Sequence, residues 1–556
     1  MLSTYTYPKY SYQRPPELDA PDAVQRHPVV VVGAGPVGLS AAIDLARQGI
    51  PVLLLDDDDT VSIGSRGVCY AKRALEVLDR LGCGQPMVDK GVTWNVGRTF
   101  FDTEEVFNFN LLPEAGHERP GMINLQQYYL EEFLVWRAQE LPSLSLRWKH
   151  KVTKVERVGN GGNEGARVEV ATPDGAFTLH ADWLIVADGA RSPIRNMLGL
   201  EIDGKVFQDR FLIADVVMSA DFPAERWFWF EPPFHRFEGA AAGKPSSVLL
   251  HRQADNVWRI DFQLGWDADP EAEKKPEKVL PRIKAMLGDE REFELEWVSV
   301  YTFQCRRMGS FRHGRVLFVG DAAHQVSPFG ARGANSGIQD VDNLGWKLKA
   351  VLDGVAPEAL MDSYSEERTF AADENLLNST RSTDFITPKS PTSKLFRNAV
   401  LGLAREFPFA RKLVNSGRLS VPAYLTASTL NTPDADAFDG WMVPGAPMDD
   451  APVSVDGAAG WLLRQVADQF TLMVFGDAAI HLPALPVPVR VLRVKTPGAT
   501  LQAGDVVDTE GHLTRRYDGQ PGTCYLLRPD QHVAARWRAF DAAALHAALG
   551  RALCLQ

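Results

Sequence analysis

The chain has 556 residues, of which 45% are hydrophobic and 23% charged, a composition typical of soluble globular proteins. Its length predicts two or three domains, and its formal net charge of −12 at pH 7 argues against a nucleic-acid or acidic-membrane partner. Because we find neither a leader sequence nor an apolar run of about 18 residues, we expect a cytoplasmic protein without membrane contact.

The first motif along the chain is a glycine loop between two apolar runs. Four valines starting at Val29 lead into GAGPVG at residues 33–38, and the second apolar run ends in Asp56. This order of strand, glycine turn, helix, strand and acid is typical of a dinucleotide-binding βαβ unit, whose helix N-terminus binds the pyrophosphate. The motif by itself leaves NAD and FAD open. The residues predicted to bind the nucleotide are Gly33, Gly35, Pro36, Val37, Gly38, Asp56 and Asp57.

Two further strand-end aspartates lie far downstream. The segment ADWLIVADGARSPIR, residues 181–195, contains an apolar strand that ends at Asp188. The segment GRVLFVGDAAH, residues 314–324, contains another, which ends at Gly320 and Asp321. A Pro- and Gly-rich loop follows, and then a helix whose free N–H groups at residues 333–336 would face negative charge. Aspartates at such positions can bind ribose or ribityl hydroxyls.

The glycine loop, the DG motif and the GD motif together resemble the single-component FAD-dependent aromatic hydroxylases, relatives of p-hydroxybenzoate hydroxylase and phenol hydroxylase. The resemblance covers about residues 29–368 and is closest to the 3-(3-hydroxyphenyl)propionate hydroxylase-like branch. It implies permanently bound FAD, with NADH or NADPH as a transient co-substrate. The implied reaction is hydroxylation of a phenolic substrate by O2 through a flavin C4a-hydroperoxide.

The resemblance also assigns single residues. Arg66, in GSRG, and Gln127, in NLQQYYLEE, match positions that the family keeps beside the flavin. Asp188 would serve FAD and the passing nicotinamide nucleotide, and Asp321 the ribityl chain. Where the family usually has Glu, this chain has Asp56, which is one methylene shorter. The residues expected around the isoalloxazine edge are Pro328, Gly330, Gly333, Ala334 and Asn335, with Gly320 in the preceding turn.

Between the DG and GD motifs the pattern changes to strands. VWRIDFQL, residues 257–264, alternates between an apolar face containing Trp258 and Phe262 and a polar face containing Arg259. In FELEWVSVYTF, residues 293–303, we expect the aromatics and leucine to share one face. The pattern predicts an inserted sheet with one face over the flavin and an aromatic substrate; the alternative is that these aromatics form a core.

Oxygen transfer to a phenol requires a means to deprotonate it and a dry pocket. His324 fits a scaffold role better than a catalytic one. Arg259 or Arg307 would pair with a substrate carboxylate, although a solvated arginine is the commoner case. The catalytic candidates are His235, His251, Tyr301 and Pro328, and the substrate-binding candidates are Trp229, Arg259 and Phe329.

Other functions stay open at this point. Trp227, Trp229 and Pro232 echo the W-x-W-x-x-P signature of flavin-dependent halogenases, but Glu231 replaces the apolar residue usual before the proline. A related monooxygenase acting on a polyketide-type aromatic, or removing a halogen or carboxylate, would share every cofactor motif. A non-catalytic flavoprotein is the remaining alternative.

The predicted fold is α/β: a Rossmann-like FAD-binding domain with an inserted β-sheet substrate domain, and a C-terminal thioredoxin-like domain. With five scattered cysteines and no C-x-x-C pair, that last domain cannot exchange dithiols, and we expect neither disulfides nor a metal site. A packing or homodimer role is more plausible for it. The predicted segments are 1–26 (arm), 27–205 and 308–380 (FAD-binding), 206–307 (inserted sheet), 381–440 (helices and linker) and 441–556 (C-terminal domain).

Overall fold

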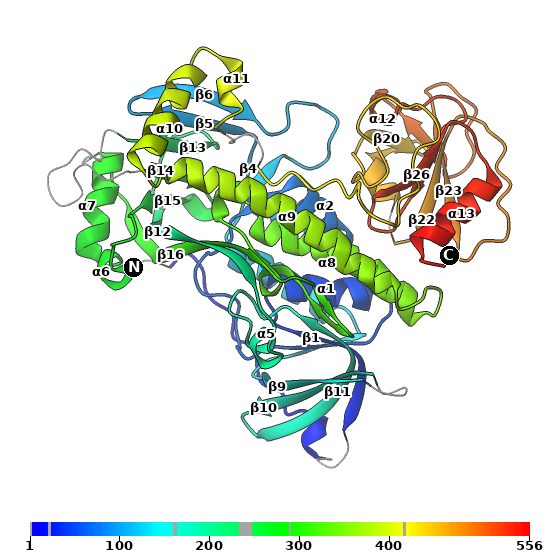
Figure 1. Cartoon of the computed structure of the whole chain (residues 1–556), viewed down its shortest axis with the longest axis horizontal. Coiled ribbons are helices and arrows are strands. Elements are labelled where there is room, and N and C mark those ends of the chain that lie inside the picture. Colours follow the sequence, from blue (N-terminus) through cyan, green and yellow to red (C-terminus); the bar gives the residue numbers. More distant parts are fainter. Residues whose placement is uncertain are drawn as a thin grey trace.

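The computed structural model describes residues 3–19, 24–159, 164–232, 247–288, 291–414, 419–466 and 468–555. These residues form an α/β structure with three bodies (Figure 1). The predicted FAD-binding part lies at the lower centre of the view, the inserted sheet at the upper left, and the C-terminal part at the upper right. In the part of the chain that is described, no helix has the length and apolarity to cross a membrane.

The predicted FAD-binding part is organised around a sheet with the path β17-β18-β11-β1-β2-β8. Strands β18, β11, β1, β2 and β8 run parallel to one another, and helices α1 and α8 pack on them. Because helices cover the sheet, its strands are continuous apolar runs, as in the fully buried β2. The bounds are β1 (Gln25–Val32), β2 (Val52–Leu55), β8 (Leu144–Arg147), β9 (Lys151–Val158), β10 (Gly165–Thr172), β11 (Gly175–Val186), β17 (Arg312–His313), β18 (Val316–Phe318), α1 (Pro36–Arg47), α2 (Lys72–Leu81), α3 (Gly84–Lys90), α4 (Gln127–Gln139), α5 (Pro193–Met197) and α8 (Gly333–Leu352). A small sheet adds β3 (Cys69–Ala71), β4 (Val92–Trp94) and β7 (Met122–Asn124).

The N-terminal arm packs on α4 rather than lying loosely on the surface. The ring of Tyr5 stacks on that of Tyr128, with 4.2 Å between the centroids. The Tyr7 hydroxyl accepts a hydrogen bond from the Gly64 amide, and the Thr4 amide donates to a carboxylate oxygen of Glu296 in the inserted sheet. The arm therefore connects the FAD-binding part to the inserted sheet.

The inserted sheet is larger than its predicted range of 206–307. Its strand order is β19-β16-β12-β15-β14-β13-β5-β6, and β5 and β6 come from residues 96–110, far upstream in the sequence. β5 pairs in parallel with β13, a contact that no local pattern predicts. The bounds are β5 (Val96–Phe101), β6 (Glu104–Asn110), β12 (Asp203–Val217), β13 (Arg226–Phe230), β14 (Ser247–Arg252), β15 (Val257–Gln263), β16 (Glu294–Arg307), β19 (His324–Gln325), α6 (Pro270–Glu273) and α7 (Pro276–Leu287).

The two faces of this sheet differ from the expectation. Trp258 and Phe262 pack under α7 and form a core, so the polar face of β15 is the one that faces the FAD-binding part. Phe293 and Leu295 join this same core, whereas Tyr301 packs with Phe211 on the other side. The prediction that the aromatics and leucine of 293–303 share a face is wrong, because the register of β12 and β16 shifts at Asp215/Val216 and breaks the two-residue alternation.

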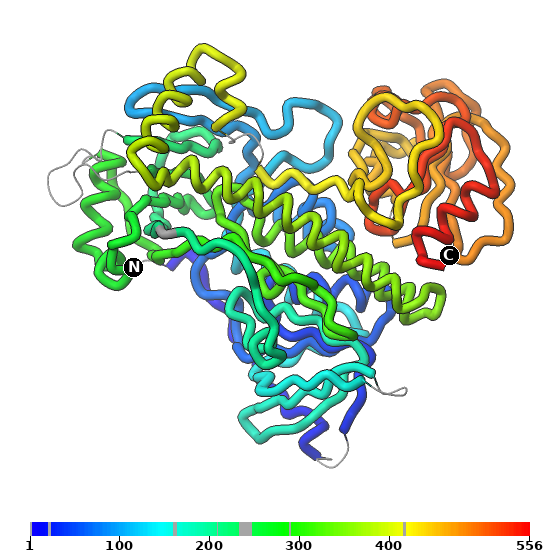
Figure 2. The backbone as a smooth tube through the Cα atoms, in the orientation of Figure 1, coloured from blue at the N-terminus to red at the C-terminus, as the bar shows by residue number. Residues whose placement is uncertain are grey.

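Helices from the following segment cover the inserted sheet. In Figure 1 the long helix α9 (Leu360–Ile386) crosses the molecule diagonally, and α10 (Pro391–Ala404) and α11 (Pro408–Arg411) lie over β5 and β6. Figure 2 shows the chain then running as an extended strap to the C-terminal part. One helix therefore extends from the FAD-binding part to the inserted sheet.

The C-terminal part is a seven-stranded sheet, ordered β21-β20-β24-β23-β22-β25-β26, with two helices. The thioredoxin-like assignment stays a prediction. The bounds are β20 (Pro452–Val455), β21 (Ala458–Trp461), β22 (Phe470–Phe475), β23 (Val489–Lys495), β24 (Val506–Asp508), β25 (Cys524–Leu527), β26 (Val533–Trp537), α12 (His512–Arg516) and α13 (Ala542–Ala552).

Buried charges join the C-terminal part to α8 and α9. Arg528 donates hydrogen bonds of 2.6 and 3.0 Å to the two carboxylate oxygens of Glu367, and the side chains are 0% and 1% exposed. Lys347 donates to Glu367 at 2.7 Å, and Asp530 accepts from Arg528. Arg528 and Asp530 thus link the C-terminal part to helices α8 and α9.

Candidate cofactor and substrate site

The three predicted nucleotide turns meet at one edge of the first sheet. A Cβ atom added to Gly33 would lie 2.4 Å from the carbonyl oxygen of Ala187, the residue before Asp188. A Cβ on Gly38 would lie 1.8 Å from the Gly33 carbonyl oxygen, and one on Gly320 would lie 3.0 Å from a Val37 methyl group. Only glycine permits such approaches. The carboxyl ends of β1, β11 and β18 therefore form a single groove, as a dinucleotide requires.

The start of α1 fits a pyrophosphate. Gly35 is the N-cap residue, no side chain caps the helix, and a Cβ on Gly35 would meet nothing within 4 Å. Among the described residues, no side chain therefore takes the first N–H groups after Pro36, and an anion bound there would be stabilised by the helix dipole. At the end of β11, Oδ1 of Asp188 is buried and has no hydrogen-bond partner among the described residues, while Oδ2 accepts from the Ile194 amide at 3.1 Å. Both features fit a ligand that brings phosphates and hydroxyl donors.

Asp56 uses its carboxylate within the loop. Oδ2 accepts a hydrogen bond of 2.5 Å from the Ala34 amide, and Oδ1 accepts one of 2.8 Å from the Asp58 amide. The shorter side chain thereby connects the end of β2 to the glycine turn, and Asp57 beside it is exposed. Ribose binding by these two residues stays a prediction.

The loop at residues 62–67, which carries Arg66, is held from two sides. Gln127 accepts a hydrogen bond of 2.8 Å from the Gly67 amide and donates to Glu131 at 2.8 Å. From the inserted sheet, Arg259 donates to the backbone carbonyl oxygens of Ser65 and Arg66. The side chain of Arg66 is exposed. Its charge acts on Asp321: burial raises the pKa of the Asp321 carboxyl, and His324 and Arg66 oppose part of that rise.

The loop expected around the isoalloxazine packs between the groove and the inserted sheet. η5 (Pro328–Gly330) leaves Pro328 exposed and buries Phe329 against Phe211 and Phe303, with ring centroids 4.9 and 5.1 Å away. The α8 helix begins at Gly333 with no side-chain cap, so the N–H groups at its first residues, including Ala334, are available to an anion. Asn335 is fully engaged: its side chain accepts from the Ala71 amide and donates to the Cys69 and Ala331 carbonyl oxygens.

A small cavity of about 50 Å³ lies against this loop. Phe228 and Phe230 of the inserted sheet and Phe329 of the loop give it aromatic walls, and the end of α9 closes it. Its polar groups include two arginines, Arg98 and Arg226. Its full lining is Arg98, Thr99, Phe109, Arg226, Phe228, Phe230, Phe329, Ser382, Ile386, Val414 and Leu419. Its lining of aromatic side chains with few polar groups, next to the predicted nucleotide turns, has the chemical character of a site for an aromatic ring.

The predicted substrate and catalytic residues separate in space. Phe329 lines the cavity, but Trp229 lies on the opposite face of β13, stacked on Phe100 at 5.0 Å. Arg259 pairs with both carboxylate oxygens of Asp215 at 2.8 Å, so it is not available to a substrate carboxylate. Trp229 points away from the cavity because successive residues of a strand face opposite sides of the sheet. Arg259 is engaged because its charge partner, Asp215, lies opposite it on the paired strand β12. His235 lies outside the described residues.

A row of buried polar side chains crosses the inserted sheet beside the cavity. Arg226, His251, Arg259 and Asp215 are successive cross-strand partners on β13, β14, β15 and β12. Burial, Arg259 and Arg226 hold the pKa of His251 well below its usual range, so this histidine is neutral and a weak base. Tyr301 packs near the row, in the aromatic cluster of Phe211 and Phe303.

Sequence reasoning missed Arg226 and Asp261. Burial raises the pKa of Asp261 to about 7, and the Asp215 carboxylate adds to the rise while Arg259 and Arg226 oppose it. Arg226 directly precedes the aromatic run of residues 227–230, and Asp261 lies in VWRIDFQL, residues 257–264. The available signal was a charged residue within a strand of aromatic residues. Burying such a charge is costly, so its presence there indicates a functional role.

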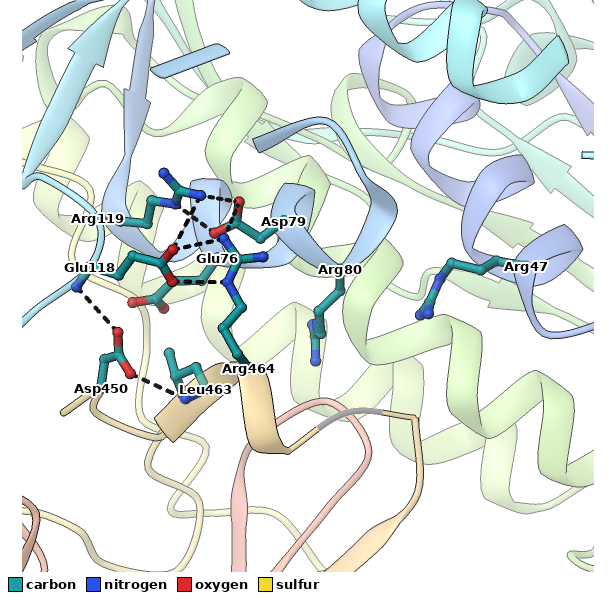
Figure 3. A pocket seen from close by; sticks show the side chains of 9 residues that line it. All are labelled: Arg47, Glu76, Asp79, Arg80, Glu118, Arg119, Asp450, Leu463 and Arg464. Atoms are coloured by element: carbon teal, nitrogen blue, oxygen red, sulfur yellow. Dashed lines mark hydrogen bonds and ion pairs between the residues drawn. The ribbon is translucent and has the colours of Figure 1, made fainter. Parts of the chain in front are cut away.

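A second hollow lies between the FAD-binding part and the C-terminal part (Figure 3). Its walls are charged, and its cations and anions pair closely. Arg464 and Arg119 both contact Asp79, and Arg464 also binds Glu118. Arg80 pairs with Asp342 on α8. Such a surface suits a seam between domains rather than an aromatic ligand.

Comparison with known proteins agrees with this geometry. Residues 26–379 match the family model described as FAD binding domain. A 3-(3-hydroxy-phenyl)propionate/3-hydroxycinnamic acid hydroxylase of Mycolicibacterium smegmatis is 28% identical over 408 residues, 73% of this chain and 69% of its own. The 6-methylpretetramide 4-monooxygenase of Streptomyces rimosus is 29% identical over 561 residues, covering 94% and 92%. The crystal structure of the flavin-dependent monooxygenase PieE, with FAD and substrate, has a TM-score of 0.79 and 23% identity over 96% of this chain and 100% of that one.

Proposed function

Because this chain belongs to the family of FAD-dependent aromatic monooxygenases that carry this FAD binding domain, we propose that it hydroxylates a phenolic ring, using O2 and electrons from NADH or NADPH. The family and the FAD cofactor are established by the match; the phenol and the nicotinamide nucleotide are the proposal. The observation that supports it most is the position of the cavity. Phe329 belongs both to the cavity wall and to the loop expected at the flavin.

When bound, FAD would supply the redox chemistry of the reaction. The chain contributes position and electrostatics. The uncapped starts of α1 and α8 offer N–H groups to negative charge on the pyrophosphate and on the flavin edge. Asp188, whose Oδ1 lacks a partner among the described residues, and Asp321 would accept hydrogen bonds from hydroxyl groups of the cofactor. The phenylalanines of the cavity exclude water from the site of oxygen transfer.

The proposal is tested with purified protein and a panel of phenols. We expect a yellow protein whose NADH or NADPH oxidation accelerates on addition of a phenol, with a product one oxygen atom heavier. A folded, colourless protein that does not take up FAD contradicts the assignment. Stimulated nicotinamide oxidation that yields hydrogen peroxide and no hydroxylated product with any phenol contradicts the substrate class.

A second candidate substrate is a polyketide-type aromatic. The relative that acts on 6-methylpretetramide matches almost the whole chain, including the C-terminal part, whereas the phenylpropionate hydroxylase matches 73% of it. Including a fused-ring phenolic polyketide in the same panel separates the two. Faster coupled turnover of a monocyclic phenol favours the first candidate, and faster turnover of the fused-ring compound favours the second.

A further inference from the structure

The helical hairpin of α10 and α11 exposes an unusual number of apolar side chains. Of the twenty large apolar side chains that are exposed in the described residues, six lie within residues 395–413, and Leu395 is the most exposed of all twenty, at 71%. In Figure 1 the hairpin forms the top of the molecule, on the outer side of β5 and β6. The six residues, which we call the apolar face of the hairpin, are Leu395, Phe396, Leu403, Phe407, Phe409 and Leu413. A concentration of exposed apolar side chains of this kind usually marks an interaction site.

The local sequence builds this hairpin without help from a partner. Ser390 and Ser393 form a capping box at the start of α10. At its other end, the guanidinium of Arg411 donates hydrogen bonds of 2.8 and 3.0 Å to the carbonyl oxygens of Ala404 and Arg405, which would otherwise lack intrahelical partners. The exposed side chains therefore stand on a well-defined helical surface.

Helix α10 is apolar on both of its sides. Its inner residues are buried in one hydrophobic core with β6: Val400, Leu401 and Ala404. On the outer side, Leu395 and Leu403 lie about two helical turns apart. The Phe407 amide donates to the Leu403 carbonyl oxygen at 2.9 Å, so the outer stripe continues for a further turn. A helix that is apolar all round is normally covered all round, and nothing in the described part of the chain covers this outer side.

The same segment is basic, although the chain as a whole carries a net charge of −12. Residues 389–413 contain six basic side chains and one acidic one. Three of the cations have carboxylate partners elsewhere: Lys394 and Arg397 share Glu231, and Arg405 contacts Glu104. The whole-chain charge, which argued against an acidic membrane, therefore does not describe this part of the surface.

Two further cations beside the apolar face keep their full charge. Arg411 contacts backbone carbonyl oxygens, and Lys412 is exposed. Neither has a carboxylate partner within the described ranges. The hairpin thus combines exposed phenylalanine and leucine with uncompensated positive charge, which is the composition of helices that lie in the interface of an anionic membrane.

The charges also argue against the other occupants. A second copy would meet this face through a twofold contact, which places the same patch on both sides and brings like charges together. A folded acidic protein would match the cations, but it would need a groove to receive side chains that project from the edge of the molecule (Figure 2). Phe407 and Phe409 are such side chains, with ring centroids 5.9 Å apart. A lipid headgroup layer receives projecting side chains without a preformed groove.

We propose that the apolar face of the hairpin binds an anionic lipid surface, with its phenylalanines and leucines at the boundary between headgroups and acyl chains and with Arg411 and Lys412 at the headgroups. The hairpin lies between two residues of the cavity wall, Ile386 and Val414. A membrane on its outer face would therefore adjoin the cavity, where it would concentrate an apolar aromatic compound dissolved in the lipid. The inference concerns binding and does not depend on the proposed function.

The test is co-sedimentation of the full, FAD-loaded chain with unilamellar vesicles. We expect binding to phosphatidylcholine vesicles that contain phosphatidylglycerol, weaker binding to phosphatidylcholine alone, and loss of binding at high salt, because salt screens exposed charges. The double variant Leu395→Ser/Phe409→Ser should bind at least about 10-fold more weakly, because two large apolar side chains no longer enter the lipid. Lys412→Glu should lower the affinity on the order of 10-fold and flatten its salt dependence.

The matched control is Leu501→Ser, which removes an equally accessible leucine, 49% exposed, from the C-terminal part. We expect it to bind vesicles like the parent protein. All variants should retain the FAD content and the thermal unfolding of the parent, because the substituted side chains are exposed and lie outside the nucleotide turns.

Several results would overturn the proposal. These are a parent protein that binds neither kind of vesicle, equal affinity for anionic and neutral vesicles, and equal affinity of the double variant and the parent. Analytical ultracentrifugation tests the second copy: a parent dimer that binds no vesicles, and that the double variant converts to monomers, would assign the face to self-association. Vesicle binding by a protein that hydroxylates no phenol leaves this inference standing while the proposed function fails, and hydroxylation without vesicle binding does the reverse.

Discussion

Replacing Glu367 by glutamine removes the central charge of the contact between the C-terminal part and helices α8 and α9. The glutamate accepts from Arg528, Lys347 and Asn343, and all these side chains are buried. Glutamine keeps the shape but replaces one oxygen by an NH₂ group, which faces a donor instead of accepting from it. We therefore expect a large loss of stability although no volume is removed.

The magnitude follows from the two cations. Burial lowers the pKa of Lys347 to about 8. When Glu367 is replaced, the Lys347 amine can lose its proton instead of staying charged and unpaired. At about pH 7.5 that deprotonation costs at most about 1 kcal/mol, because one pKa unit corresponds to about 1.4 kcal/mol. Arg528 keeps Asp530 but loses a charged acceptor, and a hydrogen bond to a charged group contributes about 1.5–3 kcal/mol. The sum, about 1.5–4 kcal/mol, overlaps the range of about 3–5 kcal/mol that is typical of breaking a buried ion pair.

The assay compares urea unfolding and limited proteolysis of the strap that precedes the C-terminal part. Asp373→Asn is the matched control, because Asp373 lies on the same helix α9 but pairs with Arg307 at the surface, with 56% of its side chain exposed. We expect it to change the free energy of unfolding by less than about 1 kcal/mol. Equal stability of Glu367→Gln and Asp373→Asn would refute the view that the buried network holds the C-terminal part in place.

Three further outcomes are expected. Gly33 has a φ of +104°, and a Cβ there would meet a carbonyl oxygen, so Gly33→Ala should destabilise the protein by at least about 2 kcal/mol. Gly35→Ala should leave stability nearly unchanged and weaken FAD binding. Thermal unfolding measures the stability of both variants, and flavin fluorescence measures FAD binding. Asp261→Asn should stabilise the protein by up to about 4 kcal/mol at pH 8 and by almost nothing near pH 4. The reason is that folding raises the pKa of the Asp261 carboxyl from 3.8 to about 7, so the parent protein loses stability as the pH rises through that interval. Denaturant titration at several pH values checks the sign. Arg259→Met should lower the free energy of unfolding by about 3–5 kcal/mol, because it leaves the Asp215 charge unpaired. It should also lower the affinity for FAD, because Arg259 no longer holds the loop that contains Arg66. Equal FAD affinity of variant and parent would show that the loop needs no support from the sheet.

The cofactor groove could be predicted from the sequence because its determinants are local. A glycine turn, the helix after it and a strand-end acid lie within a few residues of one another, and their spacing encodes close backbone approaches such as that of Gly33 to Ala187. The pairing of the three turns follows from parallel strands, whose carboxyl ends share one edge. FAD was therefore predictable, and the family match confirms it.

The substrate side was less predictable because it depends on which face a residue occupies and which charge it meets. The register shift at Asp215/Val216 sends the two ends of 293–303 to different sides of the sheet. Arg259 and Arg226 look alike in sequence, yet one faces a carboxylate on a neighbouring strand and the other does not. Neither fact is encoded within one segment, since each depends on pairing between distant strands.

Two buried charge clusters in this molecule illustrate how structure and function can be told apart. Between the domains, Glu367 meets two cations and the neighbouring charges are matched in turn, as expected of a contact whose role is to persist. On the inserted sheet, atoms of Arg226, His251 and Asp261 lack partners in the described structure, beside a cavity and the flavin loop. Folding alone would favour filling or removing those groups, because each unmet atom costs stability. Their presence is explained if a ligand completes the cluster, and the stabilisation expected for Asp261→Asn measures the cost of burying its carboxylate.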